Sequence, residues 1–257
     1  ANLIAQAFAL WLAQRTGKPA SELKIGVGHD SRVSAPALLL QVLQGLAVQG
    51  AQPFDCGLAS TPSMFMSVVF PETRFDGSIM ITASHLPYNR NGLKFFNADG
   101  GLEHADITDL LETAAVLSAG QADISKVSKV DLISLYAQSL CEKIRLGVKA
   151  DDYDRPLAGL HIVVDAGNGA GGFFVRQVLE PLGADTAGSQ FLEPDGMFPN
   201  HIPNPENKQA MDSVRAATVE HHADMGIIFD TDVDRMSAVL HDGSEVNRDA
   251  IIAMISA

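Results

Sequence analysis

Apolar residues follow two different periods along this chain. Short apolar runs typical of buried strands alternate with longer segments in which apolar residues recur every three or four positions, as in amphipathic helices. The predicted strands cover 24–30, 77–83, 92–98, 160–166, 225–230 and 236–243. The predicted helices cover 1–18, 34–51, 61–70, 106–119, 131–148, 171–184, 208–223 and 247–257. The alternation of strands and helices predicts an α/β fold.

A polar segment divides this pattern. Residues 149–159, KADDYDRPLAG, are polar and end in proline and glycine, which is typical of a domain boundary. We therefore expect two α/β domains with mixed sheets flanked by helices, over 1–150 and 156–245. A weak repeat supports two related units, since the order strand end, polar loop, helix and Gly-Ala occurs both from Asp30 and from Asp165.

Both ends of the chain carry helical periodicity without a capping residue. The first residues lack a start methionine, and the run from residue 247 stops without a cap. We interpret the chain as part of a longer multidomain enzyme, in which 246–257 begins a truncated following segment. The oligomeric state stays open.

Composition narrows the possible partners. With 46% hydrophobic residues, the 257-residue chain can bury a sizeable core. Its net charge of −13 disfavours nucleic acid and anionic membrane surfaces as partners. No apolar run is long enough to cross a bilayer. Cys56 and Cys141 are far apart in the sequence and outside any CxxC spacing, which indicates two reduced thiols. We expect a cytoplasmic protein, with an organelle stroma as the alternative.

An acidic loop is the first candidate for chemistry. Asp230, Asp232 and Asp234 directly follow an apolar strand and precede Arg235. Such crowded carboxylates repel one another and call for a cation, and three hard oxygen ligands on one loop suit Mg²⁺. A solvated acidic loop is the plain alternative. An EF-hand calcium loop does not fit, because Arg235 and His241 stand where it needs glycine and glutamate.

Two other motifs have more than one interpretation. FDTDV matches the local pattern of haloacid-dehalogenase-type phosphatases, in which Asp230 would be the nucleophile, but few residues follow to supply the remaining groups. Gly167, Gly169 and Gly172 have the GxGxxG spacing of dinucleotide sites. Tight turns between strand and helix explain these glycines better, because the acidic residue expected at the end of the next strand is not clearly present.

A Ser-His pair at the end of a predicted strand is the second candidate site. Phosphoryl transfer needs a nucleophilic oxygen, a cation and a group that accepts and donates a proton. Ser84, the acidic loop, His85 and Lys94 could supply these parts. Asn91-Gly92 is a tight-turn signal that would return Lys94 toward Ser84. A polar loop at a sheet edge and a surface lysine are the alternatives.

Four motifs together resemble the α-D-phosphohexomutase superfamily, which contains phosphoglucomutases and phosphomannomutases. They are GHDSR, TASHLPYNRNGLKFF, VDAGNGAGG and FDTDVDR, in the right order along nearly the whole chain. The serine and aspartate motifs are specific as a pair. The chain departs from the family pattern in having Leu86 where the family has asparagine, and Thr231 and Val233 where it has glycines.

The resemblance implies a function and a set of site residues. It implies a phosphohexomutase that interconverts hexose 1-phosphate and 6-phosphate through a phosphoserine and a bisphosphate intermediate, with a sugar bisphosphate as activator. Ser84 would carry the phosphoryl group, and one Mg²⁺ would bridge it to Asp230, Asp232 and Asp234. Arg235 matches the arginine beside that group.

Several points stay open at this stage. Arg32 either has a role in the site or only pairs with Asp30. The motifs that distinguish glucose from mannose lie outside this chain, so hexose specificity stays open. A catalytically incomplete metal-binding fragment and the phosphatase are the alternatives to the mutase.

Overall fold

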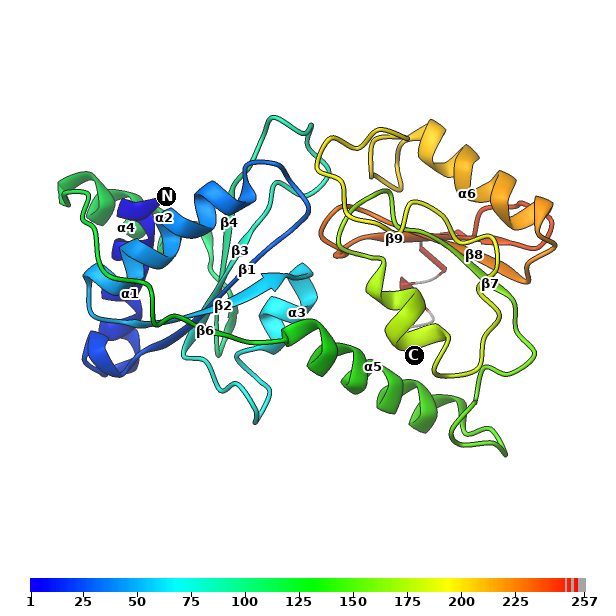
Figure 1. The fold of residues 1–257 in the computed structure, drawn as a ribbon, viewed down its shortest axis with the longest axis horizontal. Coiled ribbons are helices and arrows are strands. Elements are labelled where there is room, and N and C mark those ends of the chain that lie inside the picture. The colour runs from blue at the N-terminus through cyan, green and yellow to red at the C-terminus, as the bar shows by residue number, and fades with distance from the viewer. Residues whose placement is uncertain (248, 251, 254–257) are drawn as a thin grey trace. The chain divides into compact units, whose positions relative to one another are not determined.

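The computed structural model describes residues 1–247, 249–250 and 252–253. These residues form two compact units, Ala1–Leu132 and Ile133–Ala257. Each unit is an α/β layer structure with its own sheet and its own core (Figure 1). Among the described residues, none of the helices is both long enough and apolar enough to span a membrane.

The first unit contains a six-stranded mixed sheet in the order β5-β4-β3-β1-β2-β6. The central strands are parallel, and β4 and β5 run antiparallel at one edge. The strands are β1 (Lys24–His29), β2 (Gln52–Leu58), β3 (Gly77–Ile81), β4 (Leu93–Asn97), β5 (Gly100–Gly101) and β6 (Ser128–Lys129). The helices are α1 (Asn2–Thr16), the 3₁₀ turn η1 (Ala20–Glu22), α2 (Ala35–Val48), α3 (Thr61–Met66) and α4 (His104–Val116).

The alternation of large and small residues along β1 decides which helices cover which face of this sheet. Ile25 and Val27 belong to the core formed with α1, α2 and α4 on one face. Gly26 and Gly28 point to the other face, where a Cβ atom would lie 2.5 Å from Phe75 and from Met64 of α3. Figure 1 shows α3 on the opposite side of the sheet from α1 and α2.

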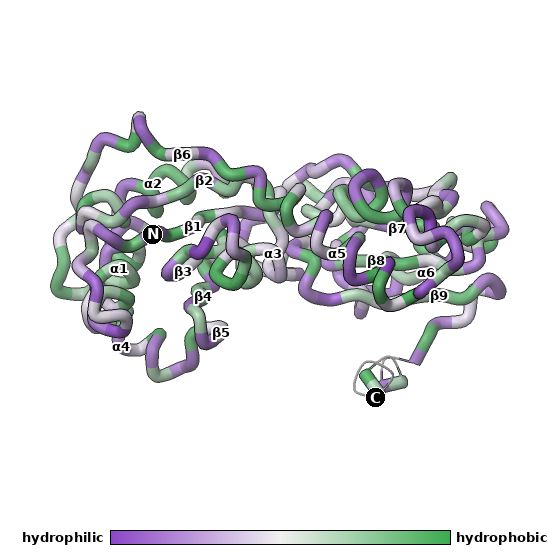
Figure 2. The backbone as a smooth tube through the Cα atoms, turned by 90° about the horizontal axis from the view of Figure 1, so that it is seen from below, coloured by the Kyte–Doolittle hydropathy of each residue, from purple (hydrophilic) through white to green (hydrophobic). Residues whose placement is uncertain are grey.

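The second unit contains the three-stranded sheet β7-β8-β9, with β7 and β8 parallel and β9 antiparallel. Its elements are α5 (Leu132–Val148), β7 (Ile162–Asp165), the π-helical segment η2 (Phe174–Leu179), α6 (Lys208–Glu220), β8 (Met225–Phe229) and β9 (Met236–Leu240). Val163 and Ile228 face α6, whereas Val164 and Phe229 face the core shared with η2 and α5. Figure 2 shows the hydrophobic β8 and the mixed hydropathy of α6.

The compact units divide earlier than the sequence boundary at 149–159. Helix α5 belongs with the second unit because its apolar face, including Ala137 and Cys141, packs on Val178 and Leu182. The polar segment therefore lies inside the second unit. Part of the helix predicted over 247–257 falls outside the described residues.

Gly45 is required by the crossing of α1 and α2. A Cβ atom at Gly45 would lie 2.3 Å from the backbone oxygen of Asn2 and 2.9 Å from Cβ of Ala5. We predict that Gly45→Ala lowers the free energy of unfolding by about 1–3 kcal/mol through overpacking, although alanine favours helices. Gly147→Ala in α5 is the matched control, since nothing lies within 4 Å of its added methyl. Urea unfolding should show the control slightly stabilised; a neutral Gly45→Ala would contradict the close crossing.

Candidate active site

Ser84 lies in the loop of residues 82–92 that joins β3 to β4. Its backbone has φ 52°, in the left-handed region that non-glycine residues rarely adopt. Such a conformation persists only where the surroundings enforce it, and it is concentrated at functional sites. The contacts that enforce it come from Arg32, Asp30 and Thr82. We call residues 82–92 the serine loop.

The fully buried guanidinium of Arg32 holds the serine loop together. Its Nε donates to Oδ2 of Asp30 at 3.0 Å, and its four terminal N–H groups donate to the backbone carbonyls of the loop. The carbonyls belong to Ser84, Leu86, Pro87 and Arg90. All five guanidinium donors are therefore engaged within the protein. The ion pair with Asp30 is present, and we infer that Arg32 acts on the site by positioning the loop.

Thr82 and Asp30 complete this arrangement. The backbone N–H of Ser84 donates to Oγ1 of Thr82 at 2.9 Å, and that hydroxyl donates to Oδ2 of buried Asp30 at 2.8 Å. The chain Ser84–Thr82–Asp30–Arg32 thus sets the serine backbone. Sequence reasoning did not assign Thr82 a role, although its place in the TASH motif was a signal.

His85 and Lys94 have different surroundings. Nδ1 of His85 lies 3.4 Å from Oγ of Ser84, so the imidazole is at the edge of hydrogen-bonding distance. Lys94 lies on β4 opposite Met80, and its Nζ donates to Oγ1 of Thr61 at the start of α3 at 3.4 Å. Strands β3 and β4 are antiparallel, but the prediction of a tight turn at Asn91-Gly92 is wrong. The whole serine loop makes the connection, and Gly92 lacks the positive φ of such a turn.

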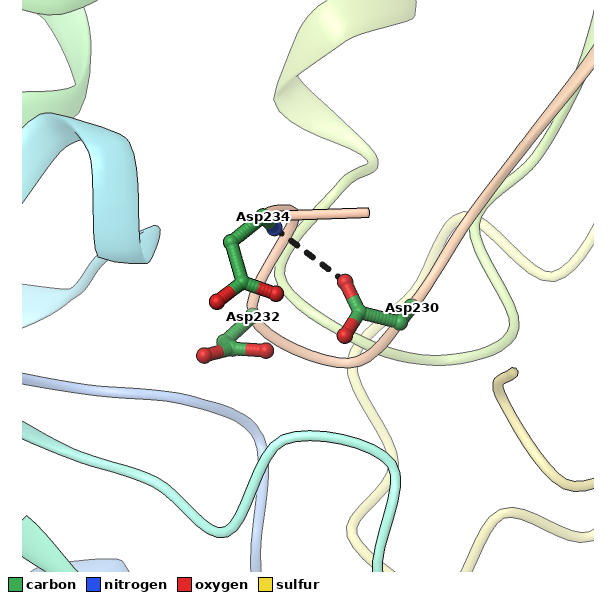
Figure 3. Close-up of side chains that lie close together, drawn as sticks. All are labelled: Asp230, Asp232 and Asp234. Carbon is green, nitrogen blue, oxygen red and sulfur yellow. Dashed lines mark hydrogen bonds between the residues drawn. The ribbon is translucent and has the colours of Figure 1, made fainter. Parts of the chain in front are cut away.

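The three aspartates gather on the short connection between β8 and β9 (Figure 3). One carboxylate oxygen from each of Asp230, Asp232 and Asp234 lies within 4.8 Å of the others. Asp230 and Asp232 are fully buried and Asp234 is more exposed. We call residues 230–234 the aspartate loop.

Asp230 is the anchor of the aspartate loop. Its Oδ1 accepts the backbone N–H groups of Asp234 and Arg235, each at 3.1 Å, and the Arg235 guanidinium contacts its Oδ2 at 3.1 Å. Burial, followed by the charges of Asp232 and Asp234, raises the pKa of Asp230 to about 7. The favourable contacts to Arg235 do not outweigh these effects.

The donor set of the aspartate loop fits a hard divalent cation. Three carboxylate oxygens close together are the ligands that Mg²⁺ takes in proteins, with its other positions left to water or phosphate oxygens. A cation would also offset the charge repulsion that raises the pKa of Asp230. Val233 has φ 64°, in the left-handed region that glycine adopts more readily than other residues.

The GxGxxG glycines serve backbone packing at this site. Gly167 has φ 53°, in the left-handed region. A Cβ atom at Gly169 would lie 2.7 Å from the backbone oxygen of Thr231, and one at Gly172 would lie 2.1 Å from that of Leu192. Residues 167–172, which we call the glycine loop, therefore lie directly against the aspartate loop.

The fold and its loops define a class of protein. Ser84, His85, Lys94 and Arg32 belong to the first unit, and the aspartates with Arg235 belong to the second. The molecule is an α/β protein of two units, with an ordered serine loop on one unit and a carboxylate cluster suited to a divalent cation on the other.

Comparison with known families identifies this architecture. Residues 1–117 match "Phosphoglucomutase/phosphomannomutase, alpha/beta/alpha domain I", and residues 135–243 match domain II of the same family. The chain belongs to the phosphoglucomutase/phosphomannomutase family, of which it contains domains I and II.

Individual relatives support this family assignment. The chain is 31% identical over 251 residues to the phosphomannomutase/phosphoglucomutase of Pseudomonas putida, covering 96% of this chain and 51% of that protein. It is 33% identical over 239 residues to a phosphomannomutase of Escherichia coli, covering 87% and 50%. A crystal structure of a family protein from Burkholderia thailandensis matches with a TM-score of 0.82 at 26% identity, covering 99% and 53%. The chain thus spans about half the length of these relatives.

The first prediction for the candidate site concerns Arg32. Arg32→Ala should lower the free energy of unfolding by about 3–5 kcal/mol, because it leaves the buried Asp30 carboxylate without its cation. Arg32→Lys should also increase amide exchange in the serine loop, since an ammonium has only three donors. Arg90→Ala removes an exposed arginine from the same loop and is the control. Unchanged exchange in Arg32→Lys would show that the loop does not depend on the guanidinium.

The second prediction concerns the cation. Millimolar Mg²⁺ should raise the melting temperature of the wild type, because the cation binds only the folded aspartate loop. Asp232→Asn should lose most of this increase. The same variant should melt higher than the wild type without Mg²⁺, since one repelling charge is removed. A melting temperature that Mg²⁺ does not change in either protein would support a solvated acidic loop.

The third prediction concerns pH. Since the folded pKa of Asp230 is about 7 and its ordinary value is 3.8, the metal-free fold should lose stability as pH rises between these values. Mg²⁺ competes with the proton on Asp230, so its apparent affinity should fall as pH drops below about 7. Calorimetric titration with Mg²⁺ measures how the affinity changes with pH. A range from pH 5 to pH 8 extends about one to two units to each side of this pKa. An affinity independent of pH between pH 5 and about pH 6.5 would contradict the raised pKa of Asp230.

Proposed function

We propose that this chain is the phosphoserine- and metal-bearing half of a phosphohexomutase that interconverts hexose 1-phosphate and hexose 6-phosphate. The observation that carries the proposal is the serine loop, in which a buried arginine and a Thr–Asp pair hold Ser84 at φ 52°. The family relationship and the aspartate loop support it.

Each candidate residue receives a role in this proposal. Ser84 carries the phosphoryl group on Oγ and transfers it to a hydroxyl oxygen of the hexose phosphate. The P–O bond to serine breaks as the P–O bond to the sugar forms, and the sugar's proton passes to His85 or Lys94. The resulting bisphosphate returns its other phosphoryl group to Ser84. A sugar bisphosphate from solution therefore acts as the activator, because it can load an unphosphorylated serine.

The second unit supplies the charge compensation. When bound, Mg²⁺ would neutralise charge on the phosphoryl group, and we assign Asp230, Asp232 and Asp234 together with the phosphorylated Ser84 as its ligands. Arg235 orients Asp230 through its guanidinium and adds positive charge beside the phosphoryl group. The hexose phosphate is held by such local cations against a net charge of −13.

A haloacid-dehalogenase-type phosphatase would instead use Asp230 as the nucleophile. Both oxygens of Asp230 already accept hydrogen bonds, Oδ1 from two backbone amides and Oδ2 from Arg235. These contacts make Asp230 the anchor of the loop, and the match to two phosphoglucomutase/phosphomannomutase domains favours the mutase over this phosphatase. We also place the protein in the cytoplasm as part of this proposal, in keeping with its two buried free cysteines.

The phosphoryl carrier tests the proposal. After incubation with a labelled hexose bisphosphate, the label should be on Ser84, stable in acid and absent from Ser84→Ala. Ser125→Ala, which changes an exposed serine of the same unit, should label normally. Label on Asp230, released by hydroxylamine as an acyl phosphate, would refute the mutase assignment. Labelled Ser84 without isomerisation of hexose monophosphates would identify the chain as a half that lacks part of the machinery.

A further inference from the structure

A buried ion pair at the end of β7 has no part in the proposed chemistry. Asp165 is fully buried and His201 is 5% exposed. Nε2 of His201 lies 3.0 Å from each carboxylate oxygen of Asp165. His201 comes from the proline-rich segment before α6, so the pair joins two parts of the second unit that are distant in sequence.

Both ring nitrogens of His201 face hydrogen-bond acceptors. Nδ1 lies 3.1 Å from the backbone oxygen of Ile202, on the other side of the ring from Asp165. A neutral imidazole has only one N–H group and would leave one of these contacts unmade, whereas the imidazolium satisfies both. The geometry therefore favours the protonated ring.

Among the described residues, Asp165 is the charged group that acts on the His201 ring. Asp165 is the titratable group facing the ring, while Phe191 packs edge-on and Gly167 and Pro203 pack beside it. Burial lowers the pKa of His201, but the hydrogen bond and charge of Asp165 and the carbonyl of Ile202 together outweigh it and raise the pKa above 6.5. This direction agrees with the geometry.

Asp165 connects the pair to the glycine loop. Its Oδ1 accepts the backbone N–H of Gly167 at 2.9 Å, and its Oδ2 accepts Nε2 of Gln190 at 2.8 Å. The same amide nitrogen lies 2.7 Å from Oγ of Ser213 on α6. The carboxylate thus fixes the start of the glycine loop relative to β7 and α6.

The glycine loop in turn contacts the aspartate loop. The backbone N–H of Ala170 donates to the oxygen of Thr231 at 2.8 Å, and Gly169 lies so close to Thr231 that a Cβ atom would come within 2.8 Å of its Cα. Thr231 stands between Asp230 and Asp232. A shift of the glycine loop must therefore move the backbone that carries two of the proposed ligands.

We propose that the His201–Asp165 ion pair is a positioning device for the aspartate loop, and that it keeps the loop in its cation-binding shape only while His201 is protonated. The inference rests on the proposed function, since it takes the aspartate loop to bind Mg²⁺. Because the folded pKa of His201 is raised, the pair's contribution is complete below about pH 6.5 and is lost as pH rises through the folded pKa.

Mg²⁺ titrations of the wild type and His201→Gln across a pH series test this proposal. The glutamine amide can still donate one hydrogen bond to Asp165 but carries no charge. At pH 6 the variant should bind Mg²⁺ about tenfold more weakly than the wild type, which is the effect typical of losing a residue that supports a metal ligand. The ratio of the two dissociation constants should approach one at high pH. Titration of Asp230 affects both proteins and cancels in the ratio. His241→Gln, an exposed histidine of the same unit, should give a ratio of one throughout.

A second measurement uses the wild type alone and does not require the variant to fold. In NMR titrations of the metal-free protein, the amide signals of Ala170 and Thr231 should show a titration step with the midpoint of the His201 ring, in addition to the step caused by Asp230. The positioning role would be overturned if the ratio of the dissociation constants of His201→Gln and the wild type were one at pH 6 or did not change with pH. A His201 ring that is neutral at pH 6 would overturn it as well. A wild type that binds no Mg²⁺ would instead refute the metal assignment in the proposed function.

Discussion

Repulsion among three carboxylates is the constraint on which the second unit's site depends. Asp230 and Asp232 are fully buried, so little solvent screens their charges. The protein offsets part of this cost with two backbone amides and the Arg235 guanidinium on Asp230. Burial and the charges of Asp232 and Asp234 nevertheless keep the pKa of Asp230 raised, because these contacts do not offset the cost of its negative form. A divalent cation bound by the three carboxylates would supply the missing positive charge.

The serine loop of the first unit needs hydrogen-bond donors for its backbone carbonyl oxygens. Here the backbone presents several carbonyl oxygens that a sheet or helix would normally pair, and a buried guanidinium collects four of them. Asp30 balances its charge within the same network. The left-handed backbone of Ser84 is therefore enforced by contacts, and its strain is offset by hydrogen bonds made inside a region of low dielectric.

Long periodic segments were predictable because local pattern and packing agree in them. Strands β1, β3, β7, β8 and β9 and helices α1, α2, α4, α5 and α6 occur where the hydrophobic spacing predicts them. The two-residue strands β5 and β6 carry no such signal, since sheet pairing alone defines them. Asn91-Gly92 failed as a hairpin signal because Arg32, distant in sequence, holds the whole serine loop in another path.

The sequence by itself determined the α/β class, the aspartate triad and the family, because these depend on periodicity and on motifs of adjacent residues. The domain division at Leu132 and the contacts of Thr82, Arg32 and His201 were decided only by the tertiary structure. Each depends on a contact between residues that are distant in the chain. Burial makes the loss of such a contact costly, because a buried charge without a partner inside the protein is strongly destabilising.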